Sequence, residues 1–215
     1  AKKHKSVKSF IYEAQAIILK HKNFQKYILS RVFFSLYLPG MGLYAAYCQD
    51  KFNFDFSEVG IFTILNVIAA GFASYLSGWL GDNFGHKSSM LLSYFGHLIA
   101  VILAIFASNM VWVYGIFIAI GIGQGAFLPS AMNLVYDFAG ERDTKTYLAL
   151  IDTLLAPFIF LFITVIGKLV QSGLYQTSFY IIAIGLSISI LILYFSVKDP
   201  KLIDKTSFHL DGFSS

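Results

Sequence analysis

Six apolar stretches, each long enough to cross a lipid bilayer, constrain this chain more than any other feature. A transmembrane helix needs roughly 20 apolar residues to cross a hydrocarbon core about 30 Å thick. Each stretch is continuously apolar rather than alternating with a period of two, which favours helices over barrel strands. Short connections predict antiparallel neighbours, and therefore an all-α membrane protein with one bundle of six transmembrane helices. The predicted spans are 27–48, 59–80, 88–106, 110–136, 147–170 and 174–197.

The composition excludes the main alternatives. Hydrophobic residues make up 57% of the 215 residues and charged residues only 13%, too few to cover a soluble domain of this size. The same figures exclude a disordered chain, and the single cysteine, Cys48, excludes a disulfide framework. The five histidines have no pair at metal-ligand spacing, and neither a phosphate-binding loop nor a G-x-S-G protease motif is present. We expect no metal, no cofactor and no enzymatic activity.

Lysine and arginine positions predict the orientation of the bundle. With the first residue on the cytoplasmic side, all but Lys51 and Lys168 of the 16 basic residues fall on that side, Arg31 being counted among them. Both termini are then cytoplasmic, and we expect an integral protein of a bacterial inner membrane. Because the basic residues flank membrane spans without a nucleic-acid-binding motif, we expect the lipid bilayer as a partner and no nucleic acid.

Residues 1–26 are basic and amphipathic, and they lack the uninterrupted apolar run of a signal peptide. Their apolar residues fall on one helical face, which suits a cytoplasmic linker or a helix lying along the inner headgroup layer. A solvated, partly helical linker fits equally well. The chain starts with Ala1 rather than Met, from which we expect a piece of a longer protein, and 198–215 is expected to be a cytoplasmic tail. The apolar residues of this face are Phe10, Ile11, Ala14, Ile17 and Ile18.

Three prolines lie inside predicted spans: Pro39 in the first, Pro129 in the fourth and Pro157 in the fifth. A proline removes a backbone donor and kinks a helix, and broken helices near the bilayer midplane often mark the binding sites of transporters. These prolines are candidate hinges, although a kink that only serves packing explains each of them as well.

The turn between the second and third spans carries the most specific pattern. It reads from Gly78 to Lys87 as GWLGDNFGHK and resembles the cytoplasmic signature of the major facilitator superfamily, G-x-L-x-D-(R/K)-x-G-(R/K)-(R/K). Asn83 and His86 depart from the signature, so its basic cluster is weaker than usual. The matching residues are Gly78, Leu80, Asp82, Gly85 and Lys87.

The resemblance covers the whole six-span region, which equals one half of that family's twelve-helix fold. The fourth span reads GIGQG over 121–125, with glycine where the amino-terminal half of the family often has the arginine of R-x-x-Q-G. The fifth reads APFIF over 156–160 and lacks the glycines of G-P-x-x-G-G. These departures resemble the carboxy-terminal half, and they remove the marks of drug–proton antiporters.

Polar residues inside spans need a partner or a water-filled cavity. In the family architecture, the first, second, fourth and fifth spans of a half border the central cavity. This implies six candidate cavity or coupling residues: Asn66, Gln124, Asp152, Tyr37, Tyr44 and Tyr47. A structural ion pair or a helix-start contact near the cytoplasmic mouth explains Asp152 as well. Close helix packing explains Gln124, and a packed helix face explains the tyrosines. His97, in the third span, is expected outside the cavity.

The resemblance implies secondary active transport of a small solute by alternating access, with a coupling proton or ion. The Gly78–Lys87 turn would be a cytoplasmic gate, in which Asp82 braces against a helix start in the other half. The partners would be the small-molecule substrate and either a missing amino-terminal six-helix half or a second copy. The alternative is a non-transporting six-helix scaffold, or a truncated half-transporter, that binds a partner through its uncovered cavity face.

Overall fold

The computed structural model describes residues 17–140 and 142–201, and within them the chain is helical and has no strand. A short π-helical turn, η1, continues the last helix. The elements are α2 (Lys22–Phe34), α3 (Tyr37–Phe52), α4 (Phe56–Phe84), α5 (His86–Phe106), α6 (Met110–Ala139), α7 (Thr144–Gln171), α8 (Tyr175–Leu191) and η1 (Ile192–Ser196).

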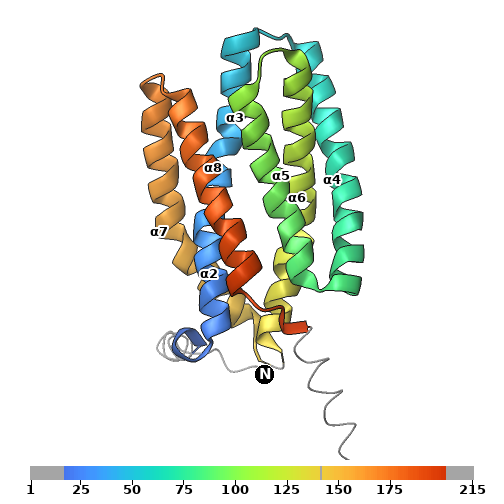
Figure 1. Ribbon diagram of the computed structural model, residues 1–215, viewed down its shortest axis with the longest axis vertical. Helices are drawn as coiled ribbons and strands as arrows, with labels where there is room; N and C mark the ends of the chain where they lie inside the picture. Colours follow the sequence, from blue (N-terminus) through green and yellow to red (C-terminus); the bar gives the residue numbers. More distant parts are fainter. Residues whose placement is uncertain (1–16, 141, 202–215) are drawn as a thin grey trace, which may run out of the picture.

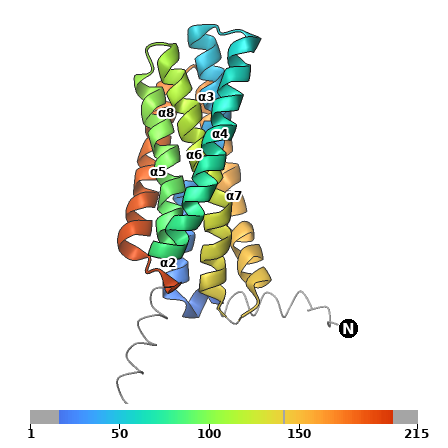
Figure 2. The same cartoon turned by 90° about the vertical axis from the view of Figure 1, so that its right-hand side faces the viewer.

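These elements form six membrane-spanning helices, because α2 and α3 together make the first span and α8 and η1 the last. The predicted all-α membrane bundle is confirmed. α2 begins at Lys22, before the expected first residue, Tyr27. The start of α2, the α4–α5 turn and the end of α8 all lie at one end of the bundle (Figures 1 and 2). We call this the motif end, and the other the far end.

The first span is interrupted at Ser35 and Leu36, one turn before Pro39. Proline has no N–H to donate to the carbonyl four residues earlier, which here belongs to Ser35. The backbone N–H of Leu38 donates to that carbonyl instead, at 3.1 Å, in the tighter pattern of a 3₁₀ turn. The sequence therefore explains where the span breaks.

Glycines bring α6 into backbone contact with its two neighbours. A Cβ built on Gly125 would lie 2.6 Å from the Cα of Ala70 in α4, and one on Gly96 of α5 would lie 2.8 Å from the Cα of Gly123 in α6. Small residues permit such approach in membrane bundles, where packing and hydrogen bonds hold helices together. In Figure 1, α4, α5 and α6 stand together at one side and α7 at the opposite side.

Aromatic and serine side chains fill the interior between α2, α5 and α8. Phe34 stacks on Tyr94 with ring centres 3.8 Å apart, and both rings are buried. Ser30 donates to the carbonyl of Ser189 at 3.0 Å, so this buried hydroxyl has a partner.

Most of the expected linker lies outside the described residues. Residues 202–215 of the expected tail lie outside them as well. Of its apolar face, Phe10, Ile11 and Ala14 are among the residues not described. Ile17 is buried and belongs to the hydrophobic core.

Candidate functional site

The motif turn joins α4 to α5 through Gly85, whose φ of 87° is a conformation that side chains with a Cβ rarely adopt. A side chain at this position would also collide with the carboxylate of Asp199, which follows the last span. Glycine is therefore required at position 85 by both the backbone and the contact.

Asp199 and Lys87 fasten the motif turn to the end of the last span. The Asp199 carboxylate accepts a hydrogen bond from the backbone N–H of Lys87 at 2.9 Å, at the start of α5. The Lys87 ammonium donates to the carbonyls of Tyr194 and Val197, each at 2.7 Å. An acid at a helix start and a base at a helix end both complement the helix dipole. The sequence predicted only a tail at Asp199, although an acid two residues after an apolar run was a usable signal for this contact.

Asp82 lies on the open side of the same turn. Its side chain is 81% exposed, and its ion-pair partner among the described residues is Lys201, at 3.6 Å. Lys201 also donates to the carbonyl of Gly81, at 2.9 Å. Exposed ion pairs of this kind contribute little to stability, so Asp82 is available for another partner. Gly78 faces open space, and Leu80 is half-buried.

His86, which departs from the signature, contacts α6. Its Nδ1 lies 2.6 Å from a carboxylate oxygen of Asp137, near the end of α6. The contact ties the start of α5 to the end of α6, and the sequence did not predict it because the two residues are far apart in the chain.

Asp152 lines a cavity of about 200 Å³ at the junction of α2, α6 and α7. Arg31 lines the same cavity, and its Cζ lies 4.7 Å from the centre of the Phe127 ring. From the sequence, Arg31 was counted with the basic residues of the cytoplasmic side, although the predicted span 27–48 contains it. Because α2 begins at Lys22, Arg31 lies about two and a half turns inside the first span.

Asn66 and Gln124 lie at contacts between helices. The Asn66 amide donates to the carbonyl of Phe117 at 3.0 Å and so links α4 to α6. The Gln124 amide lies 3.5 Å from the sulfur of Met41 and links α6 to α3. Both are half-buried, and neither lines the cavity that holds Asp152.

The three candidate tyrosines point to different neighbours. Tyr37 packs against His97, with ring centres 4.4 Å apart, and Tyr44 stacks on Phe179 at 5.8 Å. Tyr47 lies toward the far end. The structure therefore does not gather the six candidates into one site.

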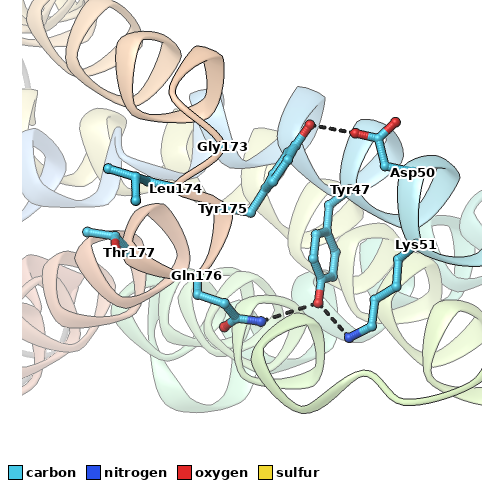
Figure 3. Close-up of a pocket in the computed structure, with 8 residues that line it drawn as sticks. All are labelled: Tyr47, Asp50, Lys51, Gly173, Leu174, Tyr175, Gln176 and Thr177. Atoms are coloured by element: carbon cyan, nitrogen blue, oxygen red, sulfur yellow. Dashed lines mark hydrogen bonds between the residues drawn. The ribbon is translucent and has the colours of Figure 1, made fainter.

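Tyr47 belongs instead to a pocket of about 440 Å³ at the far end of α3 and the start of α8 (Figure 3). Its hydroxyl accepts hydrogen bonds from Lys51 at 2.8 Å and from Gln176 at 3.2 Å. Beside it, the Tyr175 hydroxyl donates to Asp50 at 2.7 Å. These bonds hold the α3 and α8 ends together.

Pro129 and Pro157 lie within α6 and α7, which continue through them. Pro129 frees the carbonyl of Gly125, and the Ser74 hydroxyl of α4 donates to that carbonyl at 2.6 Å. This proline therefore serves the contact between α4 and α6. The hinge roles of Pro39, Pro129 and Pro157 stay predictions.

No group of three metal-binding side chains occurs in the described part of the chain. His97 is buried against Gly123 and Tyr37, and neither ring nitrogen has a hydrogen-bond partner. His97 is therefore a buried polar residue, and the sequence did not predict it to be part of the site.

The fold and the motif turn define a class: a helical membrane bundle of the kind that forms half of a transporter. A family model, described as the Major Facilitator Superfamily, matches residues 27–213. The chain belongs to this superfamily of transmembrane transporters, and its fold is that of one half. A curated relative, the niacin transporter NiaP of Acinetobacter baylyi, is 25% identical over 97 residues. That match covers 45% of this chain and 22% of the relative's length.

Proposed function

We propose that the chain is one six-helix half of a transporter that moves a small solute by alternating access, driven by a gradient. The family match over residues 27–213 carries this proposal. Two opposite charges within the spans, Arg31 and Asp152, support it, because charged groups at membrane depth are costly and commonly mark a solute or ion pathway.

The partner in this proposal is a second six-helix unit, either an amino-terminal half or another copy. Asp152 is exposed on the bundle surface within the fifth candidate span, and Asp82 is exposed at the motif end. A second unit would cover the open side of the cavity and meet the motif turn. The excess of basic residues near the motif end favours a cytoplasmic location for that end, in a bacterial inner membrane.

In the gate role, Asp82 braces a helix start of the partner unit when the cytoplasmic side is closed. The contacts of Asp199 and Lys87 hold the turn so that Asp82 projects from it. Replacing Asp82 with Asn should weaken the outward-open state, which cysteine accessibility from the two sides measures. Asp50→Asn, at the far end, is the matched control. Unchanged accessibility in Asp82→Asn refutes the gate role.

Asp152 is the coupling group in this proposal. Of the residues that line its cavity, Arg31 is the other charged one, and α6 contributes only uncharged side chains. Asp152→Asn should remove the pH dependence of solute uptake while leaving exchange of solute in place. Uptake with the normal pH dependence in this variant excludes Asp152 from coupling.

The whole proposal is tested by solute uptake into vesicles that contain the full-length gene product, with and without an imposed pH gradient. The name of the curated relative makes niacin the first solute to try in a wider screen. Gradient-driven accumulation of any solute above empty vesicles supports transport. Absence of transport across the screen, with protein correctly inserted, favours the non-transporting scaffold.

A further inference from the structure

Arg31 occupies an unusual position for an arginine. α2 carries it about 13 Å beyond Lys22, at 1.5 Å per residue, within the first of the helical segments long enough to span a membrane. Asp152 lies about 12 Å beyond the start of α7 by the same measure. Both helices start at the motif end, so the two charges have similar depth.

The guanidinium group of Arg31 has far fewer partners than donors. Arginine has five N–H donors. One of them reaches the Tyr27 hydroxyl at 3.4 Å, and the buried Nε has no partner. Arg31 forms no ion pair with an acidic side chain in the structure as described, since the ion pairs there involve other residues. A desolvated cation without a paired anion is costly, and Asp152, although it lines the same cavity, forms no ion pair with Arg31. A solute anion that reached the free donors of Arg31 would therefore be stabilised there.

The adjoining cavity is shaped for a small apolar body. The Phe127 ring and aliphatic side chains of α6 and α7 form its walls, and its volume is about 200 Å³. A cavity of roughly 150 Å³ accommodates one benzene ring, so this one has room for a ring that carries a carboxylate. The Cζ atom of Arg31 lies 4.7 Å from the centre of the Phe127 ring in a cation–π contact, which leaves the edge donors other than the one on Tyr27 free.

We propose that Arg31 binds the carboxylate of a small monoanionic solute whose planar apolar body packs in the cavity between α6 and α7. Guanidinium groups bind carboxylates with two parallel hydrogen bonds. Asp152, in the same cavity, disfavours a second negative charge on the solute, so a dicarboxylate binds less well. This inference deepens the proposed transport function by naming the substrate class.

The test is binding to purified full-length protein, measured as the rise in melting temperature with added solute. The probes are benzoate, its neutral isostere benzamide, the cation benzylammonium and the dianion isophthalate. Benzoate should stabilise the protein, and the other three should have little effect at equal concentration.

Arg31→Gln should weaken benzoate binding by at least about tenfold, because charge-assisted hydrogen bonds are lost. Arg31→Lys keeps the positive charge, so it should fold and retain part of the affinity for benzoate. It thereby separates a loss of binding in Arg31→Gln from a folding defect. Lys26→Gln is the matched control, since Lys26 is an exposed basic residue of the same helix. Its affinity should not change.

Equal stabilisation by benzoate and benzamide, or full affinity in Arg31→Gln, overturns the inference. So does tighter binding of benzylammonium. None of these results bears on the proposed transport function, which the uptake screen tests separately. Conversely, benzoate binding that depends on Arg31 in a protein that transports nothing supports the site and rejects the proposed transport.

Discussion

Two helix pairs in this bundle use glycine in opposite ways. Between α4 and α6, Gly121 and Gly125 face the backbone of Asn66 and Ala70 so closely that a methyl group would not fit. Ser77 and Ser130 reinforce this contact with a hydroxyl pair at 2.9 Å. We call this contact the α4–α6 seam.

Between α3 and α7, by contrast, a methyl group added to Gly42 or Gly167 would meet no neighbouring atom within 4 Å. These glycines line a groove of about 430 Å³ together with Pro39 and aliphatic side chains of both helices. We call it the α3–α7 groove. The seam would lose backbone contacts if its helices separated, whereas the groove can change width without such a loss. We therefore expect motion during transport to be concentrated at the groove.

The largest effect is expected from Gly125→Ala in the seam. The added methyl group meets the backbone of Ala70, which cannot move aside as a side chain could, and overpacking costs about 1–3 kcal/mol or more. Gly167→Ala in the groove is the matched control and should leave stability nearly unchanged. Thermal unfolding of the full-length protein in detergent measures both. Equal losses in the two variants would remove the distinction between the regions.

Asp199→Ala should have the next largest effect, because it releases the α4–α5 turn from the last span. The carboxylate acts on the start of α5 as a capping side chain does, and removing a cap costs about 1–2 kcal/mol. The melting temperature should fall, while Lys198→Ala, an exposed neighbour, should not change it. Wild-type stability of Asp199→Ala would show that the turn is held by other contacts.

Pro39→Ala tests whether the break in the first span, beside the α3–α7 groove, acts as a hinge. Alanine restores the N–H that could bond to the Ser35 carbonyl, so α2 and α3 should become more continuous, with a stability change below about 1 kcal/mol. The uptake rate should fall if the break is a hinge. Pro157→Ala, at an exposed position of α7, is the comparison variant. An uptake rate equal to that of the wild type assigns Pro39 to packing alone.

The smallest effect is expected at the start of α4, where Asp55 accepts hydrogen bonds from the Ser57 hydroxyl and from the backbone N–H groups of Ser57 and Glu58. These hydrogen bonds hold the pKa of Asp55 below its usual value, and the bond from the Ser57 hydroxyl has the largest effect. The stabilisation by the ionised Asp55 carboxylate is therefore fully present above the pKa that Asp55 has in the unfolded chain. It is lost as the pH falls through the lower pKa that Asp55 has in the folded protein. The melting temperature of Asp55→Ala should lie slightly below that of the wild type at neutral pH, and the gap should close in acid. A gap that does not vary with pH would contradict this.

The fold followed from the sequence because hydrocarbon leaves the backbone few options. Continuous apolar runs must be helices, and Pro39 sets the place where the first one breaks. The site was harder to predict. Arg31 was counted with the cytoplasmic basic residues although it lies inside the predicted span 27–48, and only the structure shows that it lines a cavity with Asp152.

Other contacts at the motif end join residues distant in the chain. The pairing of His86 with Asp137, and that of Lys87 with the end of the last span, depend on how α5, α6 and α8 pack. Asn66 shows a different ambiguity, since a polar residue in a span can satisfy its amide on a neighbouring helix whether or not it also faces a cavity. A single sequence carries no signal that separates these cases.

The most direct test of the expected motion compares distances across the two regions by electron paramagnetic resonance. One spin-labelled pair, Gln49 with Gln171, spans α3 and α7, and another, Ser57 with Val111, spans α4 and α6. Cys48 and any other native cysteines of the full-length protein are replaced first, so that only the introduced pair is labelled. The distances are measured with and without benzoate, at acidic and at alkaline pH. We predict that the α3–α7 distance distribution shifts while the α4–α6 distribution stays fixed. A shift of the α4–α6 pair, or no shift in either pair of a protein shown to transport, would contradict the account.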